Sequence, residues 1–299
     1  MAGTGAASRP DAILGRVPRG LRLNFPVILR RFGAAWLDRE SRKVAGPDDV
    51  WPDPKVPRDE RLRTQPPEVL LQELTAWLTG AYPRLADVRW SFYDETRTSQ
   101  VNAILREHDA RWARLAGEGD KAWRTRQQAL RDEFLEGRAT TFHADRAVYL
   151  SEEVRTDLRG GLWERAQGAR TVTHEAWHAL RRDRRRFGPF EEGSADLFAL
   201  LCVRSLCGAE MQATLRYPHL ARAVDGLTRL LAAQAGQTQE QVLLESREVD
   251  DQEGWLHRRL EATGAALQTV QAVMMIPRNT TVGHGAWYAA VERLIQEVT

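Results

Sequence analysis

The chain has 299 residues, which is long enough to bury a substantial core as one large domain or as a domain with a smaller partner. Its formal net charge of +2 gives no protein-wide field that would favour nucleic acid, so a nucleic-acid partner is not expected. Hydrophobic residues make up 42% and charged residues 28%, and no apolar run approaches the roughly 20 residues of a membrane-spanning helix, so no membrane partner is expected either.

The first segment, residues 1–66, is rich in Gly, Pro, Arg and Asp, and prolines this dense exclude a continuous helix. We interpret it as an N-terminal arm or linker. It contains no apolar signal segment, so the expected location is cytoplasmic. Cys202 and Cys207 are expected to be free thiols, because positions five apart on a helix point in different directions and the cytoplasm is reducing.

Regular structure is predicted from Pro67, a residue suited to the first turn of a helix. Two short strands are predicted from period-two alternation, one in "DVRWSFYD" from Asp87 and one in "RAVYLSEE" from Arg146. Between them, residues 98–137 have the apolar spacing of one or two long helices. From residue 162 onward the pattern is almost entirely helical, so the predicted fold class is α+β and mostly helical.

The motif with the most chemical content is HExxH, at residues 174–178 in "TVTHEAWHAL". His174 and His178 are four residues apart, so on a helix they lie one turn apart on the same face. Two neutral imidazoles on one face can bind a single Zn²⁺, and Glu175 is the residue that such sites use as general base. The alternative interpretation is a helix with two exposed histidines and a glutamate that bind no metal.

The next helix is predicted in "FEEGSADLFALLCV" and begins with acidic residues. Glu192 and Asp196 are four apart and share a face. Glu192 is suited to be the third zinc ligand, and Asp196 could accept a hydrogen bond from the far ring nitrogen of a ligating histidine. Glu191 is a rival ligand, although no carboxylate lies four residues after it. The alternative is that these acidic residues only stabilise the start of a helix.

Together these residues resemble the gluzincin group of zinc metallopeptidases, which have HExxH on one helix and ExxxD on the next. The matching residues are His174, Glu175, His178, Glu192 and Asp196. The stretch "EGSAD" is also similar to the third-ligand helix of the small members, the minigluzincins.

The resemblance covers about residues 85–207 and implies a zincin-like core with a small sheet before the active-site helix. In that arrangement the strand in "RAVYLSEE" would be the edge strand along which an extended substrate lies. With the arm at 1–66 assigned from its composition, the expected domains are that arm, a zincin-like metal-binding core at 67–207, and a helical C-terminal subdomain at 208–299 that completes the active-site cleft.

The resemblance implies a zinc-dependent hydrolase, in the first place a peptidase acting on a peptide or protein by Glu175-assisted attack of zinc-bound water. Related enzymes take a further oxyanion donor from the C-terminal helical part, where His284 and Tyr288 are candidates, with Tyr217 behind them. An ordinary structural role is the alternative for each. The arginine run from Arg181 to Arg186 would bind an acidic ligand or form a solvated loop.

Two other functions are compatible with these residues. A mononuclear Fe(II) peptide hydroxylase would use the same His/His/Glu triad, and it would depend on oxygen. An inactive zincin-like binding or scaffold protein would keep the fold without hydrolysis. Metal analysis and a hydrolysis assay distinguish the three hypotheses.

Overall fold

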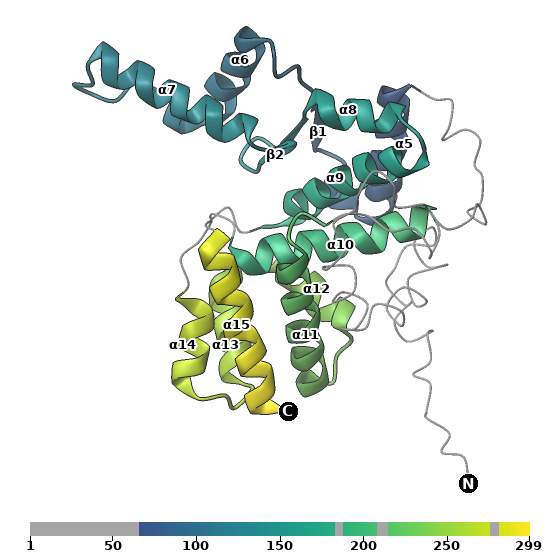
Figure 1. The fold of residues 1–299 in the computed structure, drawn as a ribbon. Coiled ribbons are helices and arrows are strands. Elements are labelled where there is room, and N and C mark those ends of the chain that lie inside the picture. The colour runs from purple at the N-terminus through teal and green to yellow at the C-terminus, as the bar shows by residue number, and fades with distance from the viewer. Residues whose placement is uncertain (1–65, 183–187, 208–214, 276–280) are drawn as a thin grey trace. The chain divides into compact units, whose positions relative to one another are not determined.

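The computed structural model describes residues 66–182, 188–207, 215–275 and 281–299, so residues 1–65 of the predicted N-terminal arm lie outside the described part. The described chain is mostly helical with one small sheet (Figure 1), which confirms the predicted α+β, mostly helical fold class. It forms two compact units, divided between residues 182 and 188. None of the described helices is both long and apolar enough to cross a membrane.

The unit at 66–182 starts its first helix at Pro67, as predicted, because the first turn of a helix needs no N–H from that position. The elements of this unit are α5 (Pro67–Ala81), η3 (Pro83–Leu85), β1 (Arg89–Phe92), α6 (Thr98–His108), η4 (Ala110–Trp112), α7 (Asp120–Leu135), β2 (Ala139–Phe142), β3 (Ala147–Leu150), α8 (Glu152–Arg159) and α9 (Leu162–Leu180).

The sheet has the strand order β1-β3-β2, with β1 parallel and β2 antiparallel to β3. Strands β1 and β3 confirm the two strands predicted from alternation, whereas β2 was not predicted. Because β3 is paired on both sides, it is the central strand, and the expectation that it forms the substrate-binding edge is wrong. Strand β2 lies at the edge instead, next to β3.

The two faces of the sheet contact different helices. In the β2–β3 ladder Thr141 is opposite Val148, and since side chains alternate along a strand both point to one face. Strands β2 and β3 contact α9, and Val148 and Leu150 are fully buried. The sheet therefore supports α9 from this side.

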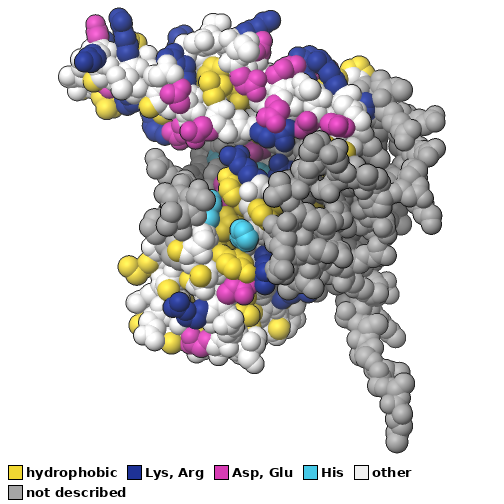
Figure 2. All heavy atoms as spheres, in the orientation of Figure 1, with side chains coloured by type: hydrophobic (Ala, Val, Ile, Leu, Met, Phe, Trp, Pro, Cys, Tyr) yellow, Lys and Arg dark blue, Asp and Glu magenta, His cyan; other side chains and the backbone are white. Residues whose placement is uncertain are grey.

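The opposite face carries Phe142 and Tyr149, which pack against an apolar cluster from α6, α7 and the segments beside them. His108, at the end of α6, is hydrogen-bonded to Asp145 at 2.9 Å and to the Tyr149 hydroxyl at 3.0 Å. The predicted helical stretch at 98–137 is thus two helices held against the sheet by one core. Figure 2 shows acidic and basic side chains interspersed over the surface of helices α6 and α7.

The long helix α9 ends at Leu180, and a side chain from the β2–β3 turn contacts its last turn. Arg146, the only described non-glycine residue with a positive φ, at 49°, donates to the Ala179 carbonyl at 3.3 Å. The last carbonyls of a helix have no partner within the helix, so a cation there satisfies one of them and complements the dipole. Arg146 also forms an ion pair with Asp87 at 2.7 Å. The sheet and the end of α9 are therefore joined.

The second unit is helical in all its described residues. Its elements are α10 (Pro189–Cys207), α11 (Pro218–Ala235), α12 (Gln239–Glu248), α13 (Gln252–Glu261), α14 (Leu267–Met274) and α15 (Thr281–Val298). Helix α11 packs against α10, α12 and α15. Cys202 in α10 is a buried free thiol, as predicted, and burial raises its pKa.

Glycine 193 explains how closely α10 approaches α11. A Cβ atom at Gly193 would lie 2.6 Å from the carbonyl oxygen of Leu220, a backbone atom that cannot easily move. The glycine of the "EGSAD" stretch is thus required by packing within this unit. The close contact at Gly193 fixes the first turns of α10, where Glu191, Glu192 and Asp196 lie.

Candidate metal centre

His174 and His178 lie one turn apart on α9, as the motif spacing predicts. Both are buried, with exposed fractions of 6% and 3%. Their Nε2 atoms are 3.0 Å apart, and their rings meet edge to face with centroids 4.7 Å apart. At this distance one imidazole N–H donates to the nitrogen of the other ring, or both nitrogens bind one cation.

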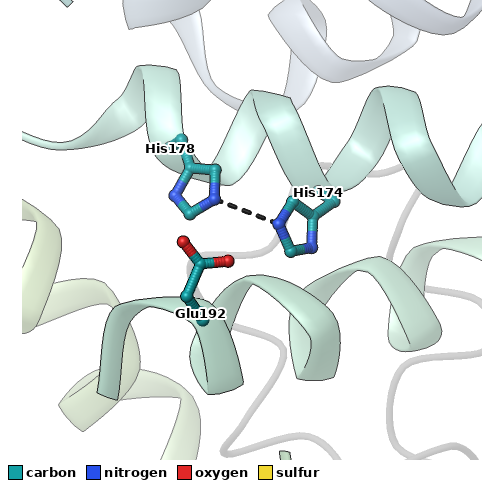
Figure 3. A group of neighbouring side chains, drawn as sticks. All are labelled: His174, His178 and Glu192. Atoms are coloured by element: carbon teal, nitrogen blue, oxygen red, sulfur yellow. Dashed lines mark hydrogen bonds between the residues drawn. The ribbon is translucent and has the colours of Figure 1, made fainter. Parts of the chain in front are cut away.

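The third side chain of the group is Glu192 on α10. Suitable ligand atoms of His174, His178 and Glu192 all lie within 4.8 Å of one another. Figure 3 shows the Glu192 carboxylate directed toward the two imidazole rings. The three residues that the sequence selected as ligands are thus a group that could hold a metal ion.

The dimensions of this group can be compared with those of a zinc site. Two nitrogens that are each about 2.05 Å from a tetrahedral zinc ion are about 3.3 Å apart. The observed separation of 3.0 Å between the two Nε2 atoms is close to that value. Two imidazole nitrogens and one carboxylate oxygen are also the donor set of catalytic zinc sites, which leave a fourth position open. His174, His178 and Glu192 are therefore a group that could hold a metal ion.

The rival ligand Glu191 has a different role. Its side chain is fully buried, and its carboxylate accepts from Arg247 Nη1 at 2.6 Å and from Gln252 Nε2 at 3.1 Å. Arg247 on α12 is itself 2% exposed. Glu191 thus joins α10 to α12 and α13, and of the two adjacent glutamates Glu192 remains the candidate ligand. Sequence reasoning missed Arg247, because it lies 56 residues beyond Glu191 and no local pattern connects them.

Glu175, the predicted general base, is 7% exposed and lies between the two histidines in the sequence of α9. Its carboxylate accepts a hydrogen bond from the hydroxyl of Thr141 on β2, with 2.6 Å between Oγ1 and Oε2. Sequence reasoning missed Thr141, since strand β2 itself was not predicted. Thr141 is paired with Val148, and because side chains alternate along a strand this pairing directs Thr141 to the face of the sheet that contacts α9.

Asp196 lies one turn after Glu192 and is fully buried. Its carboxylate accepts a hydrogen bond from the backbone N–H of Tyr217, the residue that precedes α11. That contact holds the start of α11 against α10. The hydrogen bond predicted from a ligating histidine to Asp196 stays a prediction.

The two predicted oxyanion donors lie on α15 and have different surroundings. The His284 ring meets Tyr217 edge to face at 5.3 Å, and its buried Nε2 finds no hydrogen-bond partner among the described residues. Burial lowers the pKa of His284, and the nearby charge of Glu192 acts in the opposite direction. Tyr288 instead packs against His219 at 5.7 Å and under the Arg222 guanidinium. The role of oxyanion donor stays a prediction for both residues.

Only the start of the predicted arginine run is described. Arg181 is buried, with an exposed fraction of 6%, and Arg182 is exposed. Residues 183–187 lie outside the described part, so ligand binding by this run stays a prediction.

Comparison with protein-family models, with curated proteins and with solved structures found no significant match to this chain. The chemistry of the described side chains is therefore the basis for the proposed function.

Proposed function

We propose that this protein is a zinc-dependent metallopeptidase of the gluzincin type, with a zincin-like core around α9. The observation that carries the proposal is the grouping of His174, His178 and Glu192, whose ligand atoms lie within 4.8 Å of one another. The buried, hydrogen-bonded carboxylate of Glu175, which follows His174 in α9, supports hydrolysis over simple metal storage. The metal would be held by those two imidazoles and the Glu192 carboxylate.

When bound, zinc would polarise the scissile carbonyl and lower the pKa of a water molecule beside it. Glu175 would accept the proton from the attacking water and then deliver it to the leaving amine nitrogen. One of its oxygens accepts a hydrogen bond from Thr141, and the other, which has no hydrogen-bond partner among the described residues, would receive the proton. His174, Glu175 and His178 are buried, and a less polar environment strengthens electrostatic interactions.

The expected substrate is an extended peptide or protein segment. In the resemblance an edge strand next to the active-site helix binds such a segment by backbone hydrogen bonds. Since β3 is central, we assign that role to β2, which among the described strands pairs with β3 alone. His284 would donate to the oxyanion, because its Nε2 is free of other described partners and its ring is near the Glu192 charge.

The test is peptide hydrolysis by the purified full chain loaded with zinc, assayed on a mixture of unstructured peptides with mass-spectrometric detection of products. We expect new peptide termini that disappear after treatment with a chelator and return when zinc is added. The same assay is repeated with the chain loaded with Fe(II) in place of zinc, in the presence of oxygen and 2-oxoglutarate. Hydroxylated peptides without cleavage would favour the Fe(II) hydroxylase, and no reaction under either condition would favour a non-catalytic protein.

A further inference from the structure

The side chain of Thr141 connects the edge strand β2 to Glu175. Its Oγ1 lies 2.6 Å from Glu175 Oε2 and 3.5 Å from the Glu175 carbonyl oxygen. A hydroxyl has one proton to donate, and the shorter distance indicates that Thr141 donates it to the Glu175 carboxylate. An O–H···O⁻ distance of this length is typical of a strong, charge-assisted hydrogen bond.

We propose that Thr141 is a positioning residue that orients the Glu175 carboxylate for proton transfer, an inference that rests on the proposed peptidase function. A glutamate side chain has three rotatable bonds, so its carboxylate needs an anchor to be held in one orientation. Among the described residues, Thr141 is the one side chain that hydrogen-bonds this carboxylate. Because the two oxygens belong to one planar carboxylate, a hydrogen bond that holds one of them also fixes the direction of the other.

The surroundings of Thr141 make it a stiff anchor. Thr141 is paired across the ladder with Val148, which is fully buried in the central strand. A β-branched side chain also has few accessible χ1 rotamers, so its hydroxyl direction is well defined by the strand. The position of the Glu175 carboxylate is therefore set by the sheet as well as by its own helix. Because β2 is also the proposed substrate-binding strand, the same strand would position both the general base and the substrate.

The chain offers well-matched variants for a test. Thr141→Val removes the hydroxyl and keeps the shape, and Thr141→Ser restores the hydroxyl. Thr125→Val makes the same change at an exposed position of α7, outside the proposed substrate strand. With the zinc-loaded chain and a peptide that the wild type cleaves, we expect Thr141→Val to lower kcat about tenfold or more, a part of the roughly 10²–10⁴-fold that general-base catalysis supplies. KM should stay within about twofold, because binding is not the step affected.

Thr141→Ser should recover most of the lost kcat, and Thr125→Val should match the wild type. Equal kcat in Thr141→Val and wild type would overturn the proposal, as would a loss in Thr141→Val that serine does not rescue. Zinc affinity, measured by competition with a chelating dye, should be the same in all four proteins.

A second readout does not need activity. Crystal structures of the zinc-loaded wild type and Thr141→Val should show the Glu175 carboxylate at Thr141 in the first and in a different rotamer or in several rotamers in the second. An unchanged Glu175 in Thr141→Val would overturn the positioning role. If the wild type cleaves nothing, the peptidase proposal fails, and these two structures still decide whether Thr141 orients Glu175.

Discussion

Replacement of Glu175 by glutamine is expected to lower kcat/KM for peptide hydrolysis by about 10²–10⁴-fold while zinc stays bound. Glutamine has nearly the same shape and can still accept a hydrogen bond from Thr141 through its carbonyl oxygen, but it cannot take a proton from water. The histidines and Glu192 are unchanged, so the metal ligands remain. Steady-state kinetics and the zinc content of the same preparation measure both quantities.

Glu164→Gln is the matched control, since Glu164 lies in the first turn of the same helix, away from the motif. It should retain wild-type activity and zinc. A Glu175→Gln protein with full activity would remove the proposed general base. A variant that is inactive because it has lost its zinc would give Glu175 a structural role instead.

Replacement of Arg247 by leucine is expected to reduce the free energy of unfolding by about 3–5 kcal/mol, because it leaves the Glu191 carboxylate buried without its cation. Arg247 and Glu191 are 2% and 0% exposed in their side chains, so solvent cannot compensate the charge. Denaturant unfolding followed by circular dichroism measures the change at constant zinc concentration. The same readout on Arg258→Leu, an exposed arginine on α13, should change by about 0.5 kcal/mol or less.

The double variant Glu191→Leu with Arg247→Leu distinguishes a broken pair from lost packing. Replacing both charges by apolar groups removes the uncompensated carboxylate, so the double variant should be more stable than Arg247→Leu alone. Equal stability of Arg247→Leu and wild type would contradict the role assigned to Glu191. It would also reopen the choice between Glu191 and Glu192 as the third ligand.

The parts of the site that the sequence predicted are those fixed by local geometry. His174 and His178 share a face because a helix has 3.6 residues per turn, and the start of α5 at Pro67 follows from the same helical chemistry. Alternation within one segment was enough for β1 and β3.

The parts that the sequence did not predict depend on contacts between distant segments. Strand β2 has four half-buried residues without alternating polarity, so only its pairing with β3 defines it. The central position of β3 follows from that pairing, and the edge-strand expectation failed for the same reason. Thr141 is 34 residues before Glu175 and Arg247 is 56 residues after Glu191, and neither pair leaves a periodic signal in the sequence.

The most direct test of the proposed metal centre is the metal content of the full chain, purified without added metal and measured by elemental analysis. Wild type is compared with the His174→Ala/His178→Ala double variant and with Glu192→Ala. We predict about one zinc per chain in wild type, none in the double histidine variant, and weaker retention in Glu192→Ala, as a three-ligand site requires. A wild type that binds no zinc even at saturating concentration, or a double variant that keeps one zinc per chain, would contradict the account.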